Sequence, residues 1–204
     1  MPYLIRRPPI RRSVCALIGA AIVAGASPAI ASACKPASGG SDVFQAFGDS
    51  AAYTLAPGGS FESGASGWSL SDASVVAGNE SYHVRGASDS HSLAISPTGV
   101  AVSPPICVDV TTPTFRFFAR QTSGNWAQMN VNRLWTDASG VAHTTTAGSI
   151  HGTTNWAPTA VLNLGDSLPL WQQRSTLTVR LQFLPATYGG SWAIDDVYID
   201  PYSR

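Results

Sequence analysis

The sequence predicts an all-β protein, a sandwich of short antiparallel strands, on three observations. Gly, Ser, Thr and Pro interrupt the chain after residue 33 roughly every eight to twelve residues. Apolar and polar residues alternate between these interruptions, which places every second side chain in a core. We find no stretch after residue 33 with the 3.6-residue periodicity of an amphipathic helix.

Residues 1–33 are expected to be a secretory signal peptide. Arg6, Arg7, Arg11 and Arg12 precede an apolar stretch that begins at Val14 and is too short to span a bilayer comfortably. "ASA" at residues 31–33 fits a small-x-small cleavage site. The paired arginines also suit twin-arginine export, although ordinary secretion is favoured. We therefore expect an extracellular protein, free or at the cell surface, with no transmembrane segment in the mature chain.

The charge of the remaining chain argues against nucleic acid as a partner. Four of the 12 basic residues and none of the 12 acidic residues lie in the leader. The mature chain therefore has 8 basic and 12 acidic residues. Nucleic-acid binding requires a basic face.

Two cysteines remain after the leader, Cys34 and Cys107. In an exported chain an even pair predicts a disulfide, here closing a loop of more than seventy residues and contributing about 4 kcal/mol. The alternative is a lipoprotein acylated at Cys34. "ASAC" lacks the large aliphatic residue expected three positions before the cysteine, and acylation would leave Cys107 unpaired, so the disulfide is favoured.

We expect residues 34–52 to form an irregular N-terminal arm held by this disulfide, and residues 53–204 to form the β-sandwich. "LTVRLQF" alternates most clearly, with Leu177, Val179, Leu181 and Phe183 on one face. In "TFRFFAR" Phe115 and Phe117 share one face, while Arg116 and Phe118 share the other. The further predicted strands are 53–55, 68–71, 74–78, 81–85, 92–96, 106–110, 129–135, 141–146, 160–164 and 192–200.

Two motifs at the ends of this strand-rich region resemble a known family. "GGSFESGASGW" at residues 58–68 resembles the first strand of carbohydrate-binding modules in the galactose-binding-like jelly-roll superfamily, and "WAIDDVYIDPY" from residue 192 resembles their last strand. The resemblance implies a jelly-roll sandwich whose first and last strands are adjacent, with Phe61, Trp68 and Trp192 in the core. The whole chain also resembles a group of small secreted proteins of high-GC bacteria.

The same resemblance implies a structural calcium ion held by Glu62, an aspartate of the last strand and backbone carbonyls. Hard cations require several oxygen ligands. Asp195 and Asp196 are the candidates, but neighbouring strand residues face opposite sides, so only one points at the metal unless a bulge intervenes. The alternative is that Glu62 pairs with Arg85 or Arg120 and that the two aspartates are solvated.

Exposed aromatic rings and amides are the candidate binding residues, because Trp and Tyr stack on sugar rings while amides bond the hydroxyls. In "MNVNRLW" Asn130 and Asn132 point outward, near Trp126. The alternative for each Trp is a place in the core. The candidates are Trp126, Asn130, Asn132, Trp156, Trp171 and Tyr188.

Enzyme signatures are weak. "GDSL" occurs at residues 165–168 and "FGDS" at residues 47–50, but the corresponding hydrolases need an α/β fold and a C-terminal Asp-x-x-His, which the chain lacks. The four His residues have no zinc-ligand spacing. A glycosidase pair could only come from Glu62, Glu80, Asp195 and Asp196, and the sequence does not set their separation.

We therefore expect a secreted, non-catalytic domain that binds a polysaccharide or another cell-envelope component. The second hypothesis is a structural or protein-interaction domain of the same fold without a sugar site. The third is a hydrolase acting on polysaccharide.

Overall fold

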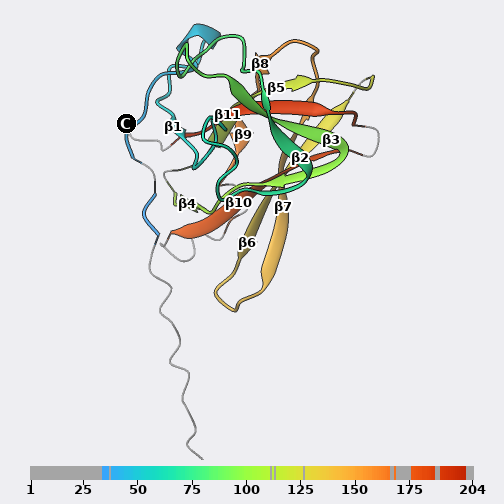
Figure 1. Ribbon diagram of the computed structural model, residues 1–204. Coiled ribbons are helices and arrows are strands. Elements are labelled where there is room, and N and C mark those ends of the chain that lie inside the picture. The colour runs from blue at the N-terminus through green and yellow to red at the C-terminus, as the bar shows by residue number, and fades with distance from the viewer. Residues whose placement is uncertain are drawn as a thin grey trace, which may run out of the picture. The chain divides into compact units, whose positions relative to one another are not determined.

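The computed structural model in Figure 1 describes residues 34–36, 38–110, 112, 114–125, 127–165, 168, 176–186 and 189–200. The predicted signal peptide lies outside these residues. Within the described ranges no helix is long and apolar enough to cross a membrane. The elements are η1 (Gln45–Phe47), β1 (Thr54–Leu55), β2 (Ser69–Ala77), β3 (His91–Val102), β4 (Ile106–Val108), β5 (Thr114–Gln121), β6 (Gln128–Thr136), β7 (Ala142–His151), β8 (Ala157–Pro158), β9 (Leu162–Asn163), β10 (Leu177–Pro185) and β11 (Trp192–Asp200).

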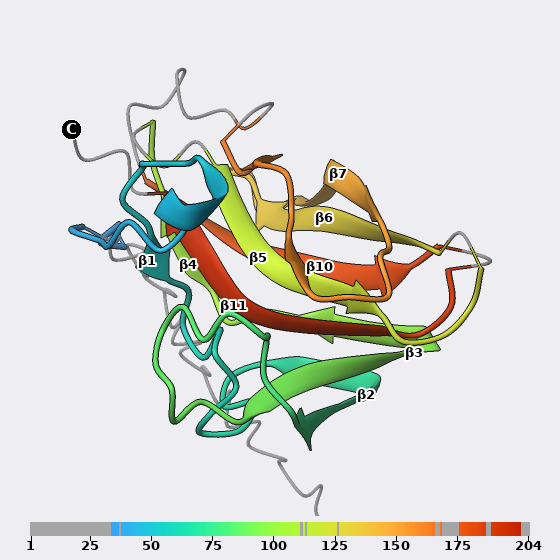
Figure 2. The same cartoon turned by 90° about the horizontal axis from the view of Figure 1, so that it is seen from above.

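The strands form one antiparallel sheet that curls into two layers. Its order is β7-β6-β10-β3-β11-β5-β8, with β2 paired to β3, β4 to β10, β1 to β11 and β9 to β5. Figure 2 shows β6 and β7 in one layer and β5 and β11 in the other. The long strand β3 joins the layers, because its start pairs with β11 and its end pairs with β10. The predicted all-β sandwich is confirmed.

The main core lies between the two layers and follows the predicted alternation. Met129 and Val131 of β6 and Leu181 and Phe183 of β10 are fully buried, whereas the residues between them are partly exposed. Phe61, Trp68 and Trp192 belong to the same core, as expected. The Trp68 ring lies 5.1 Å from that of Phe61 and 5.8 Å from that of Phe183.

A second apolar cluster covers the outer face of β5 and β11. Phe44 and Tyr53, which precede β1, pack there against Phe118, Trp156 and Tyr198. η1 lies against β5, since the Phe47 and Phe118 rings are 5.7 Å apart (Figure 2). All nine residues of β11 are buried because the main core lies on one side of this strand and the second cluster on the other.

Arg116 stabilises this second cluster through three contacts. The Arg116 guanidinium lies 4.5 Å above the Phe44 ring, donates to the Thr159 carbonyl, and pairs with Asp49 at 2.7 Å. Asp49 belongs to the "FGDS" stretch and also accepts from the Tyr53 hydroxyl. The role of Asp49 in this structure is therefore to anchor residues 41–53.

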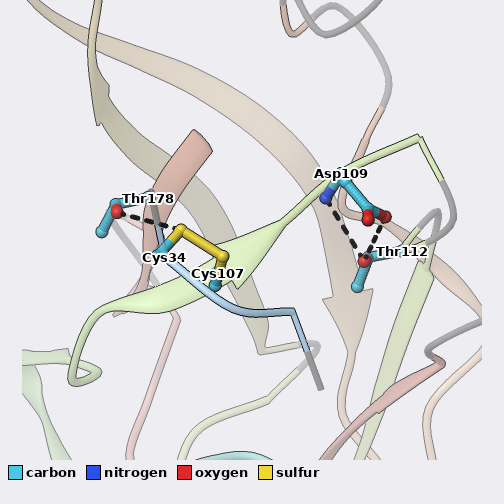
Figure 3. The surroundings of a disulfide bond; sticks show 5 residues. All are labelled: Cys34, Cys107, Asp109, Thr112 and Thr178. Atoms are coloured by element: carbon cyan, nitrogen blue, oxygen red, sulfur yellow. Dashed lines mark hydrogen bonds between the residues drawn. A yellow bond between two sulfur atoms is a disulfide. The ribbon is translucent and has the colours of Figure 1, made fainter. Parts of the chain in front are cut away.

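The predicted disulfide is present between Cys34 and Cys107, whose Cα atoms are 5.6 Å apart (Figure 3). It joins the start of the described chain to β4. The Thr178 hydroxyl of β10 donates to Cys34 Sγ at 3.6 Å, so the disulfide lies beside the β4–β10 pair.

One predicted strand is wrong. Residues 81–85 form turns and bends. The Glu80 carboxylate accepts the backbone N–H groups of Tyr82 and Val84, so the chain turns around this carboxylate. His83 adopts a left-handed φ of 50° in this turn. The predicted strands 68–71 and 74–78 are one strand, β2, which contains a β-bulge near Asp72.

Candidate functional site

The first and last strands of the sandwich are adjacent, as the resemblance implied. β1 pairs with β11, Ala56 N donates to Val197 O at 2.8 Å, and Val197 N donates to Gly59 O at 3.0 Å. Gly59 permits this approach, because a Cβ there would lie 2.8 Å from the Val197 carbonyl oxygen. Glu62 follows directly from this paired segment.

Glu62 binds the start of β3. Its carboxylate accepts the backbone N–H of Ser90 at 2.9 Å and that of His91 at 2.8 Å, and its Oε2 lies 3.2 Å from His91 Nδ1. Burial would raise the pKa of Glu62, but the hydrogen bonds from His91 and Ser90 outweigh it and hold the pKa below its ordinary value. Glu62 therefore pairs with neither Arg85 nor Arg120, which were its alternative partners.

Asp195 is fully buried in β11, and both oxygens of its carboxylate accept hydrogen bonds from backbone N–H groups. Its Oδ2 accepts the Glu80 N–H at 3.0 Å, and its Oδ1 accepts the Asp196 N–H at 2.8 Å. Burial, followed by the neighbouring charge of Asp196, raises the pKa of Asp195 to about 8. The alternative in which both aspartates are solvated is wrong, because Asp195 and Asp196 are both buried.

Asp196 is 1% exposed, and neither of its carboxylate oxygens has a hydrogen-bond partner. It occupies an irregularity in the β11–β5 pairing, with a left-handed φ of 47°. This is the bulge that lets two consecutive aspartates both turn away from solvent. Burial, followed by the charges of Glu80 and Asp89, raises the pKa of Asp196 to about 7.

The Asp196 carboxylate could bind a hard cation, but too few further ligand side chains surround it. An ionised, buried carboxylate without a partner is costly, and a cation would relieve both the desolvation and the repulsion. However, no three Asp, Glu, His or Cys side chains in the described part of the chain are placed to hold a metal ion. Glu80 and Glu62 already accept backbone N–H groups, so a cation would need carbonyl or water oxygens as well.

A polar face covers the outside of the other layer, and we call it the amide face. It is the outer side of β6, β7 and β10, where Asn132 Nδ2 donates to Gln182 Oε1 at 3.0 Å and Gln128 Nε2 donates to Asn130 Oδ1 at 3.2 Å. Alternation and register assign to it Gln128, Asn130, Asn132 and Leu134 of β6, Thr178, Arg180, Gln182 and Leu184 of β10, and Thr144, Thr146, Ser149 and His151 of β7.

The predicted binding residues divide into three groups. Asn130 and Asn132 lie on the amide face and are partly exposed, as the alternation predicted. Trp156 is only 7% exposed and packs under the Arg120 guanidinium, 5.0 Å from the ring centre, on the outside of the opposite layer. Of the two alternatives for Trp156, an exposed binding ring or a place in the core, the structure shows the second, because the ring packs in the second apolar cluster. Trp126, Trp171 and Tyr188 lie outside the described residues.

Two features were missed by the sequence reasoning. Glu80 binds the backbone of the loop and touches Asp195, although no motif connects them. Gln182 and Arg180 join the asparagines on one face because β10 pairs with β6. The outward positions of "LTVRLQF", which hold Thr178, Arg180 and Gln182, were the available signal for this face.

Solved structures share this fold. The N-terminal CBM22-1–CBM22-2 tandem domain of Paenibacillus barcinonensis Xyn10C superposes with a TM-score of 0.54 and 12% identity over 81% of this chain and 47% of that chain. The enzymatically active domain of tailspike protein 4 from bacteriophage CBA120 gives a TM-score of 0.50 and 15% identity over 71% of this chain and 21% of that chain.

The C-terminal family 22 carbohydrate-binding module of Clostridium thermocellum Xyn10B gives a TM-score of 0.48 and 16% identity, over 69% of this chain and 89% of that chain. No protein-family model and no curated protein matches the sequence. The fold is thus a jelly-roll β-sandwich of the kind found in carbohydrate-binding modules, as the two terminal motifs indicated. The chain spans less than half of the tandem-domain and tailspike chains.

Proposed function

We propose that this protein is a secreted, non-catalytic domain that binds polysaccharide through the amide face. The observation that carries the proposal is the row of partly exposed amides formed by Asn130, Asn132 and Gln182 on two paired strands. Each amide offers both a donor and an acceptor, which suits the adjacent hydroxyls of a sugar. The fold likeness to carbohydrate-binding modules supports the same function by analogy.

The strands make this face a fixed array rather than a flexible loop. Asn130 and Asn132 are two residues apart on β6, and Gln182 lies directly opposite Asn132 on β10. Their spacing is therefore about 6–7 Å along the strand and about 5 Å across it. Amides held at such spacings can contact an extended chain of sugars without losing much conformational freedom on binding.

One structural calcium ion is part of this proposal. The unpartnered Asp196 carboxylate would be its anchor, with backbone carbonyl or water oxygens completing the shell. The ion would neutralise charge where the chain around Gly59 meets β11. Asp196 lies on the opposite layer from the amide face, so the role of the ion would be in stability.

Affinity electrophoresis against soluble polysaccharides and pull-down with insoluble ones test the proposal, with calcium and with a chelator. We expect retention by at least one glycan, and a loss of about tenfold or more in affinity on Asn132→Ala. The matched control is Asn163→Ala, an exposed asparagine of β9 outside the amide face. Release of reducing ends during incubation would contradict the non-catalytic assignment.

The buried Trp156 favours one competing function, a structural or protein-interaction domain without a sugar site. If the folded protein is retained by no glycan, the carbohydrate proposal is wrong and this second function takes its place.

A further inference from the structure

Arg180 lies on β10, the strand at one side of the amide face. It is partly buried on β10, directly opposite Leu134 of β6. Thr178 and Gln182 flank it on the same side of its strand, and Gln182 bonds Asn132. A ligand lying across these amides would therefore contact the guanidinium.

This guanidinium has almost no partner within the described chain. Its Nη1 donates one long hydrogen bond of 3.4 Å to the Ser103 carbonyl, and no described carboxylate pairs with it. Other arginines of the protein are engaged. Arg85 pairs with Asp89 at 2.7 Å, and Arg116 pairs with Asp49 at 2.7 Å. Among the described residues, most of the N–H donors of Arg180 therefore have no hydrogen-bond partner.

The strands of the amide face carry no acidic side chain, and the acids nearest to them in sequence, Asp109 and Asp137, lie just beyond the ends of β4 and β6. β6, β7 and β10 contain no Asp or Glu at any position. Lys35, the only lysine of the chain, is exposed and follows Cys34, which the disulfide and the Thr178 hydroxyl hold at the end of this face (Figure 3). The buried acids Glu80, Asp195 and Asp196 lie on the other layer. Such segregation favours an anionic ligand.

We infer that the amide face recognises a glycan that carries carboxylate groups, with Arg180 as the residue that selects for the charge. This inference rests on the proposed function and specifies its substrate class. A guanidinium presents parallel N–H donors that match a carboxylate in a bidentate pair. The neighbouring amides of Asn132 and Gln182 would bond the hydroxyls of the same or the adjacent sugar.

The test compares one polymer in two charge states. Glucuronoxylan and the same preparation with its uronic acids chemically reduced to neutral sugars differ only in the carboxylates. We expect the wild-type protein to bind the acidic polymer about tenfold more tightly, because hydrogen bonds between charged groups exceed neutral ones. Arg180→Gln should remove this difference, and Arg180→Lys should restore part of it.

Two controls separate charge selection from general damage. Gln182→Ala should weaken binding of both polymers by the same factor, because the amide bonds hydroxyls. Raising the salt concentration should weaken binding of the acidic polymer and leave that of the reduced polymer unchanged. Unfolding curves of all variants establish that they are folded.

The outcomes are distinguishable. Equal wild-type affinity for both polymers overturns the inference and leaves the proposed function standing. A preference for the acidic polymer that persists in Arg180→Gln overturns the role of Arg180. Binding of neither these polymers nor any other glycan in the panel overturns the inference and the proposed function together.

Discussion

The backbone N–H of Glu80 donates a 3.0 Å hydrogen bond to Oδ2 of Asp195, 115 positions further along the chain. This contact joins the loop after β2 to the last strand, where two consecutive aspartates, Asp195 and Asp196, are buried. The Asp195 carboxylate accepts two backbone N–H groups, whereas the Asp196 carboxylate accepts no hydrogen bond. The structure therefore contains an ionisable pair whose charged form is unfavourable unless a cation neutralises it.

Chelator-treated protein should lose stability as the pH rises from about 5 to about 8. The folded pKa values of Asp195 and Asp196 are about 8 and about 7, against about 3.9 in an unfolded chain. The folded state binds more protons in this window, so the stability is complete below about pH 4 and is lost as the pH rises through about 7 and 8. Melting curves at several pH values check this, and a flat profile would contradict it.

Asp196→Asn should remove much of this pH dependence and make the chelated protein more stable at pH 8, because an amide adds no charge beside Asp195. Calcium at about a hundred times its Kd should stabilise the wild type by about 2.7 kcal/mol, or roughly 5–10 °C. It should not stabilise the variant. Calorimetry with calcium, with magnesium and with a chelator measures both effects. If calcium leaves the wild-type melting temperature unchanged, Asp196 holds no calcium.

The fold could be predicted because alternation reports directly on the core. Val179, Leu181 and Phe183 alternate with polar residues, and each is buried as that pattern requires. Alternation predicts a strand wrongly where a side chain accepts hydrogen bonds from the backbone of its own loop. Residues 81–85 alternate like a strand, but the Glu80 carboxylate binds two N–H groups that a strand would have given to a neighbour.

The candidate site was only partly predictable, because sequence does not show which outer faces are covered. Asn130 and Asn132 were correctly placed outward, and both are partly exposed. Trp156 was a candidate for stacking on a sugar, with a place in the core as the alternative, and it packs in the cluster that contains Phe44 and Tyr53. Asp195 and Asp196 became a buried pair through a left-handed residue inside a strand, and no local propensity indicates such a bulge.

Removing the disulfide should destabilise the protein by about 4 kcal/mol in the chain-entropy model. Cys34 and Cys107 are 73 positions apart, so their bond restricts a large loop in the unfolded chain. Cys34→Ser combined with Cys107→Ser avoids a free thiol, and urea unfolding monitored by fluorescence gives the change. The reduced wild type should match the double variant. A loss below about 1 kcal/mol would indicate that the unfolded chain is already compact around this loop.

Phe44→Ala should cost about 3–5 kcal/mol, more than a surface aromatic would. The Phe44 ring is fully buried, stacks on Phe118 at 5.5 Å and meets the Tyr53 ring edge-on at 4.9 Å. The matched control is Phe47→Ala in the same segment, which is only partly buried and should cost less. Urea unfolding of both variants measures the difference. A loss below about 1 kcal/mol for Phe44→Ala would mean that residues 41–53 contribute little to covering β5 and β11, and the burial of Trp156 would then need another cause.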